Sequence, residues 1–224
     1  MTALPALTTD QMREVDRIMV DAHGITLGQM MENAGRNLAW LAADRFGPKS
    51  VTVLAGPGGN GGGGLAAARH LANRGVEVAV TLARPPGEMQ EVPALQARIL
   101  GEMAVPFSPA PRPADLVIDA VLGYSLTGDP RGPAADLIQW ANGQPVVLAL
   151  DTPSGLDTTT GRIGDPCVAA TATMTLALPK TGLLESPGVV GDLYLADISV
   201  PPSVYRAFGF EIGDPFATSP VVAL

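Results

Sequence analysis

The sequence predicts an α/β fold in which helices cover both faces of a mostly parallel sheet. Three observations support this prediction. Short runs rich in valine, isoleucine and leucine alternate with stretches of helical periodicity, as they do in βαβ units. These runs are almost continuously apolar, which is typical of parallel strands buried on both faces. Glycine follows several of the helical stretches and marks where they end.

Two helices are expected before the first strand. Residues 8–24 begin with residues that can cap a helix and then carry an apolar stripe. Residues 26–47 carry Met31, Leu38 and Leu41 at helical spacing. We expect both helices to pack on or beside the sheet.

The alternation of strands and helices fills an α/β core over residues 50–201. No repeat and no linker interrupts it, so we expect a single domain over residues 1–224, with N-terminal helices in 8–46 and a short, partly ordered C-terminal tail from about Ser203. The expected strands are 50–56, 76–83, 114–123, 145–151, 170–178 and 191–198, and the expected helices between them are 64–75, 88–103 and 132–143.

The composition excludes several classes of protein. Apolar residues make up 46% and charged residues 16%, which indicates a globular protein. The net charge of −8 argues against nucleic acid and anionic membranes as partners, because phosphate groups are held mainly by Lys and Arg. Cys167 is the only cysteine, so no intrachain disulfide can form. Neither a secretory signal nor a membrane span is recognisable, and we expect a cytoplasmic protein.

A run of glycines lies between the first strand and the next helix. Gly56, Gly58 and Gly61 satisfy G-x-G-x-x-G in that context, where backbone N–H groups and a helix N-terminus can hold an anion. No Gly-Lys-Ser/Thr follows, and Arg84 stands near the position where dinucleotide-binding folds carry a ribose-binding acid. Two interpretations stay open: a cradle for a phosphate-bearing ligand, or a tight turn whose glycines serve packing alone.

Polar side chains follow several of the expected strands. Asn60, Asp119, Asp151, Ser154 and Lys180 all stand at or shortly after such strand ends. The carboxyl ends of parallel strands line one crevice, so these side chains can converge although each acid alone could be a helix cap or a solvated loop end. The two histidines lack such a setting, and no metal motif of histidine or cysteine is present. Carboxylate, amide and hydroxyl oxygens suit a hard cation.

Five motifs, taken in order, resemble the NAD(P)H-hydrate epimerase family, also called the YjeF N-terminal domain family. The resemblance implies a Rossmann-like three-layer α/β/α sandwich, commonly dimeric. It also implies interconversion of the R and S epimers at C6 of hydrated NADH or NADPH, a metabolite-repair reaction. The motifs are MENAG (31–35), GPGGNGGGGLAAARHL (56–71), IDAVLGYSLTG (118–128), ALDTPSGLD (149–157) and TLALPKTG (175–182).

The resemblance also implies site residues in this chain. A potassium ion, the implied cofactor, would be held by Asn60, Asp119 and Ser154. Asp151 is the expected acid/base residue at the hydrated ring, because a carboxyl group can pass a proton in both directions. The implied substrate-binding residues are Gly59, Asn60, Gly61, Gly62, Gly63, Gly123, Tyr124, Ser125, Leu126, Thr127, Gly128, Asp129 and Asp151.

The glycine run departs from the family pattern at two positions. Gly59 stands where the family usually has Asn, and Gly63 where it usually has Asp. Loss of a working carboxylate would lower the rate by roughly 10²–10⁴-fold. We therefore weigh a homodimeric epimerase that relies on Asp151 against an impaired relative that only binds a nucleotide or acts as a scaffold. A third hypothesis is an NADP-linked reductase that uses Arg84.

Overall fold

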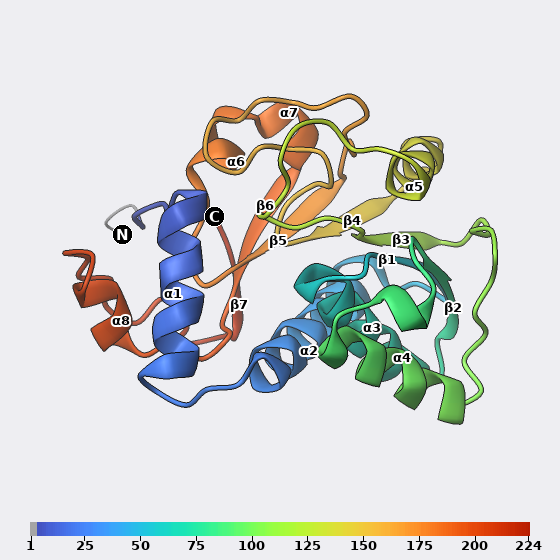
Figure 1. Ribbon diagram of the computed structural model, residues 1–224, viewed down its shortest axis with the longest axis horizontal. Coiled ribbons are helices and arrows are strands. Elements are labelled where there is room, and N and C mark those ends of the chain that lie inside the picture. The colour runs from blue at the N-terminus through green and yellow to red at the C-terminus, as the bar shows by residue number, and fades with distance from the viewer. Residues whose placement is uncertain (1–3) are drawn as a thin grey trace.

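The computed structural model describes residues 4–224, and a seven-stranded sheet runs through it (Figure 1). The strand order is β2-β1-β3-β4-β5-β6-β7, and every neighbouring pair is parallel except β6 with β7. The predicted α/β class with a mostly parallel sheet is confirmed. The strands are β1 (Ser50–Ala55), β2 (Glu77–Leu82), β3 (Leu116–Ala120), β4 (Val147–Leu150), β5 (Ala172–Leu176), β6 (Asp192–Ala196) and β7 (Val221–Ala223).

Helices cover both faces of the sheet. α2, α3 and α4 lie below it in Figure 1, and α5, α6 and α7 lie above it. Successive strand residues point to opposite faces of the sheet. Val51 and Val53 pack in the core between the sheet and α2–α4, whereas Leu54 packs in the core between the sheet and α5. The helices are α1 (Thr9–Asp21), α2 (Leu27–Phe46), α3 (Gly59–Ala72), the 3-10 helix η1 (Pro86–Glu88), α4 (Glu91–Glu102), α5 (Pro133–Asn142), α6 (Thr181–Glu185), α7 (Pro187–Val190) and α8 (Pro202–Arg206).

The first helix stands beside the sheet, next to its β6–β7 edge (Figure 1). Thr8 and Gln11 form a capping box at its start. Its buried face, which includes Val15 and Met19, packs in a second apolar cluster with Val204 and other residues near the C-terminus. Along the chain, α2 separates α1 from β1 and α3.

The C-terminal segment is more regular than expected. We expected a partly ordered tail from about Ser203, whereas the structure has α8 and β7 there. The Tyr205 hydroxyl donates to the Ala177 carbonyl oxygen at 2.9 Å, and β7 pairs with β6. Elements of five and three residues are too short to carry a periodic pattern, so tertiary contacts alone define them. No helix among residues 4–224 combines the length and the apolar character that a membrane span needs.

The glycine run forms the first turns of a helix. We expected the helix to start at Gly64, but α3 starts at Gly59. None of its glycines has a positive φ, so they take ordinary helical geometry. Their role is close packing: a Cβ added at Gly61 would overlap the Gly56 carbonyl oxygen, and one at Gly64 would overlap the Cβ of Ala120. Helix propensity disfavours glycine, and tight packing overrides that preference here.

The chain reverses its direction across the sheet next to this helix. From β1 it moves to β2 on one side, and then to β3 on the other side of β1. The crossovers that leave β1 and β3 therefore diverge at the carboxyl ends of these two strands. Such a switch point opens a crevice where ligands bind in doubly wound sheets.

Close packing of α2 on α3 gives a first prediction, about Gly35. A Cβ at Gly35 would lie 2.8 Å from both the Ala67 nitrogen and the Gly63 carbonyl oxygen. We expect Gly35→Ala to lower the free energy of unfolding by about 1–3 kcal/mol, the usual cost of overpacking.

Gly28 in the same helix provides the matched control, because only the Thr26 hydroxyl oxygen, at 3.8 Å, comes near an added Cβ. Gly28→Ala should leave stability unchanged or raise it by about 0.4–1 kcal/mol. Urea unfolding of both variants measures the two effects. Equal stability of the two variants would contradict this account of the helix contact.

Candidate functional site

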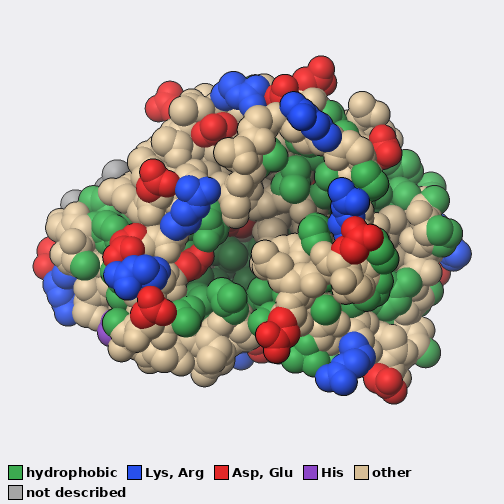
Figure 2. Space-filling view, in the orientation of Figure 1, with side chains coloured by type: hydrophobic (Ala, Val, Ile, Leu, Met, Phe, Trp, Pro, Cys, Tyr) green, Lys and Arg blue, Asp and Glu red, His purple; other side chains and the backbone are tan. Residues whose placement is uncertain are grey.

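A cavity of about 730 Å³ opens at the switch point. In Figure 2 it is the hollow near the middle of the face, with hydrophobic side chains on its floor. Its size is within the range of small-molecule sites in proteins. The wall consists of Met12, Asp16, Leu27, Met30, Met31, Ala34, Pro57, Gly58, Gly59, Asn60, Gly63, Gln90, Val121, Leu122, Gly123, Tyr124, Ser125, Leu126, Thr127, Leu150, Asp151, Leu176 and Ile198.

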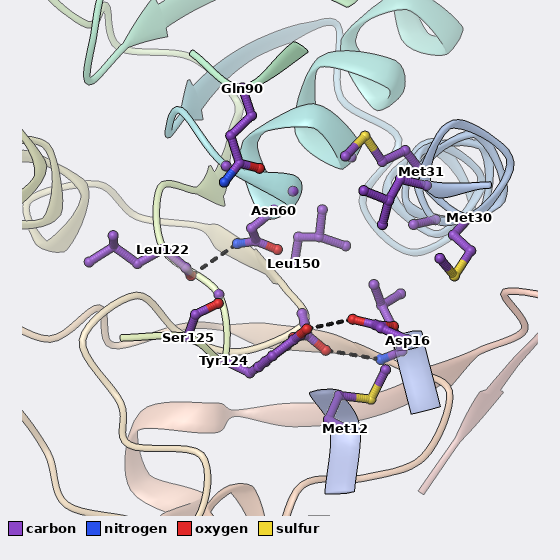
Figure 3. Close-up of a pocket in the computed structure, with 18 of the residues that line it drawn as sticks. Met12, Asp16, Met30, Met31, Asn60, Gln90, Leu122, Tyr124, Ser125 and Leu150 are labelled. Atoms are coloured by element: carbon purple, nitrogen blue, oxygen red, sulfur yellow. Dashed lines mark hydrogen bonds between the residues drawn. The ribbon is translucent and has the colours of Figure 1, made fainter. Parts of the chain in front are cut away.

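The N-terminus of α3 forms one end of the cavity. Gly58 is its N-cap residue and provides no side-chain hydrogen bond to the first turn. The first-turn N–H groups of a helix have no partner within the helix, and the helix dipole makes this end attractive to anions. Asn60 and Gln90 lie at the same end (Figure 3). This end of the cavity is therefore suited to phosphate oxygens.

Three of the predicted polar residues meet around the backbone of Leu122. The Asn60 Nδ2 donates to the Leu122 carbonyl oxygen at 3.0 Å, and the Leu122 N–H donates to the Ser154 Oγ at 2.8 Å. Asp119 lies directly behind Ser154, whose Oγ and backbone N–H donate to the carboxylate at 2.6 and 2.8 Å. The structure thus brings together Asn60, Asp119 and Ser154, although they come from three separate segments.

The Asp119 carboxyl group is fully buried, with 0% of the residue exposed. Burial raises its pKa from an ordinary 3.8 to about 6, even though the hydrogen bonds from Ser154 and Val121 favour the charged form. Among residues 4–224, no Lys, Arg or His forms an ion pair with it. Carboxylate, amide and hydroxyl oxygens are thus gathered in one place, and such oxygens are the ligands that a hard cation prefers.

Asp151 lies at the end of β4 and faces the cavity with 4% of its surface exposed. It takes a left-handed backbone conformation, with φ of 67°, where β4 ends. The ammonium group of Lys180, which is 0% exposed, donates to Asp151 Oδ1. Its two other donors reach the Thr175 Oγ1 at 3.1 Å and the Leu176 carbonyl oxygen at 2.8 Å. Lys180 is therefore a fully satisfied cation that holds Asp151 in place.

Most of the predicted substrate-binding residues line the cavity. Gly59, Asn60, Gly63, Asp151 and residues 123–127 are part of its wall. Gly61 and Gly62 lie behind the wall, packed against Gly56 and Met31. Gly128 and Asp129 lie outside it, and the exposed Asp129 carboxylate instead accepts a hydrogen bond from Arg162 Nη1 at 2.9 Å. Arg84 pairs with Glu88 and is not part of the wall.

Sequence reasoning missed the contribution of the first two helices. Met12 and Asp16 of α1, and Met30 and Met31 of α2, line the cavity (Figure 3). One signal was available in the sequence, because Asp16 stands four residues after Met12, on the helix face that also carries buried apolar residues. An acidic residue on a face that packs inward is unusual and points to a role in a site.

Position 63 has limited room for a side chain. A Cβ there would lie 2.8 Å from the Cδ2 atom of Leu150, which fills the space beside Gly63. A Cβ at Gly59 would meet only the Met31 Cε, at 3.7 Å. The two departures from the family pattern thus differ: a side chain fits at position 59, whereas at position 63 it requires Leu150 to move.

Comparisons with known proteins identify the family of this chain. Residues 27–182 match the family described as YjeF-related protein N-terminus. The chain is 45% identical over 232 residues to a protein of Dehalogenimonas lykanthroporepellens named NAD(P)H-hydrate epimerase, covering 99% of this chain and 94% of the relative. It is 43% identical over 204 residues to a protein of Hyperthermus butylicus named bifunctional NAD(P)H-hydrate repair enzyme Nnr, covering 84% of this chain but only 38% of that longer relative.

A solved structure gives the same result at the level of the fold. The crystal structure of the yeast protein YNL200c (ynu0) superposes with a TM-score of 0.85 at 25% sequence identity, covering 99% of this chain and all of that one. The family match, the close relative and the shared architecture lead to one conclusion: the chain belongs to the YjeF N-terminal domain family, also called the NAD(P)H-hydrate epimerase family.

Proposed function

We propose that the protein is an NAD(P)H-hydrate epimerase that interconverts the R and S epimers at C6 of hydrated NADH or NADPH. We further propose that it works in the cytoplasm as a homodimer, as the family resemblance implies. The observation that carries the proposed activity is the cavity at the switch point. The N-terminus of α3 lines it at one end, Asp151 with its partner Lys180 lies at the other, and apolar side chains line the space between them. Such a cavity suits both the phosphate groups and the hydrated nicotinamide ring of the substrate.

The polarity of the cavity supports one orientation of the substrate. The phosphate groups would lie against the N-terminus of α3, near Asn60 and Gln90. The hydrated ring would lie at the other end, where Met12 and Met30 offer an apolar surface beside Asp151. Residues 123–127 would contact the ligand between these two ends.

Asp151 is our proposed acid/base residue. Epimerisation requires the C6 hydroxyl group to leave and water to return on the other face of the ring. Lys180 donates to Oδ1 of Asp151, and the Asp151 side chain borders the cavity, where it can accept a proton from water. The impaired-relative hypothesis has less support, because Asp151 lines the cavity and keeps Lys180 as its buried partner.

Turnover of purified protein tests the proposed function. The R epimer of hydrated NADPH is mixed with the protein and with a dehydratase specific for the S epimer, supplied with its nucleotide cofactor. We expect NADPH absorbance to recover faster than spontaneous epimerisation allows. Recovery no faster than a blank without the protein would overturn the proposed activity, and hydride transfer to an added carbonyl compound would favour the reductase hypothesis.

Asp151→Asn tests the proposed role of that carboxylate. We expect kcat to fall by roughly 10²–10⁴-fold, as for other removed acid/base groups. The variant also leaves the buried Lys180 without its charge partner, so Tm should fall as well. The double variant Asp151→Asn/Lys180→Met removes the unpaired cation and should recover Tm without recovering kcat. Full activity of Asp151→Asn would refute the assignment.

We also propose potassium as a cofactor, held by Asn60, Asp119 and Ser154. The ion would supply positive charge next to the buried Asp119 carboxylate. In the folded protein the pKa of Asp119 is about 6, above its unfolded value of 3.8, so the folded state binds more protons between these values. The free energy of unfolding therefore falls as pH rises through this window, and a bound cation offsets that loss.

A pH-dependent effect of potassium on Tm follows from that linkage. Potassium at fixed ionic strength, compared with a large organic cation, should raise Tm by several degrees at pH 7.5 and by much less at pH 5. Asp119→Asn should abolish the difference between the two pH values, and differential scanning fluorimetry measures all four conditions. An equal effect of potassium on the variant would argue against this site.

A further inference from the structure

Asp16 is the second carboxyl group in the described wall of the cavity. It projects from α1, far in sequence from the strand ends that supply the other polar residues. The Tyr124 hydroxyl, from the loop after β3, donates to its Oδ2 atom, and both side chains lie at the ring end of the cavity (Figure 3). The role proposed for Asp151 does not use this pair.

The two carboxyl groups have complementary surroundings. Among residues 4–224, hydrogen bonds reach Oδ1 of Asp151 and Oδ2 of Asp16, and the second oxygen of each group accepts none. Asp151 forms a buried ion pair with Lys180. Asp16 forms no such ion pair within the described chain. One group is thus suited to accept a proton and the other to give one.

The pKa of Asp16 agrees with this division. Burial raises it above the ordinary value, while the hydrogen bond from Tyr124 and the charge of Lys180 lower it and the charge of Asp151 raises it. Burial, and then Asp16 and Asp151, raise the pKa of Tyr124, and Arg13 lowers it. The Tyr124 hydroxyl therefore keeps its proton and continues to orient Asp16.

We propose that Asp16 is a second catalytic residue of the epimerase, the proton donor to the C6 hydroxyl, and that Tyr124 is its positioning residue. This inference rests on the proposed function. Asp16 gives its proton to the C6 hydroxyl oxygen, the C6–O bond breaks, and water leaves as the N1 electron pair forms a double bond to C6. Water then adds to the other face of C6 and the electron pair returns to N1. Asp151 takes the proton of that water, and its transfer back to Asp16 through solvent restores the site.

The test uses the full chain and three substitutions. Asp16→Asn removes the proton donor, Tyr124→Phe removes only the hydrogen bond that orients it, and Asp21→Asn is the control at an exposed carboxylate of the same helix. The rate of epimerisation is measured across pH with the coupled dehydratase. Binding is measured as the shift in Tm on adding the equilibrium mixture of the two epimers, whose composition an epimerase cannot change.

We expect Asp16→Asn to lower kcat by roughly 10²–10⁴-fold, while the ligand concentration that gives half the Tm shift changes less than about threefold. Tyr124→Phe should lower kcat by about tenfold and move the alkaline limb of the pH profile to higher pH, because a hydrogen bond that lowers the pKa of Asp16 is lost. A role in folding alone would lower Tm without moving that limb. Asp21→Asn should match the wild type.

Two other results would overturn the inference, and they are distinguishable. If Asp16→Asn or, where it does not fold, Tyr124→Phe keeps the wild-type rate and pH profile, Asp16 is not the donor, and the proposed epimerase activity stands. If the wild type binds the hydrate but neither it nor Asp21→Asn exceeds the spontaneous rate, the proposed function fails and the inference fails with it.

Discussion

The contact between the backbones of the β1–α3 turn and the segment after β3 determines the geometry of the site. The Gly56 N–H donates to the Ala120 carbonyl oxygen at 3.0 Å, and any Cβ at Gly56 would overlap the Val121 carbonyl oxygen. Only glycine permits this approach. It brings Asn60 close enough to bond to Leu122, and Leu122 in turn contacts Ser154.

Two buried carboxyl groups, Asp119 at the end of β3 and Asp151 after β4, differ in whether a cation is paired with them. Asp119 has hydrogen-bond donors but no cation among the described residues, so burial raises its pKa. Asp151 has a buried cation in Lys180. Buried charges seldom add stability relative to apolar residues of the same shape. Their presence at adjoining strand ends is better explained by binding and chemistry than by a contribution to folding.

The first helix completes the cavity from outside the sheet. Its buried face packs against the C-terminal segment, and Met12 and Asp16 of the same helix line the cavity. The Tyr124 hydroxyl joins this helix to the loop after β3 through Asp16. The N-terminal helix, the switch-point loops and the last strands of the sheet are thus coupled at one place, although they are distant along the chain.

The sequence by itself determined the α/β class, the order of the central elements and the residues at the strand ends, because these depend on local periodicity and on where apolar runs stop. Asn60, Asp119, Ser154 and Asp151 stand where parallel strands end, and that placement is readable without coordinates. The helical state of the glycine run, the regular C-terminal elements and the position of Asp16 beside Tyr124 depend on contacts between segments far apart in sequence. Only the tertiary structure decided these features, because close packing overrides helix propensity and no local pattern records which distant side chain a residue will meet.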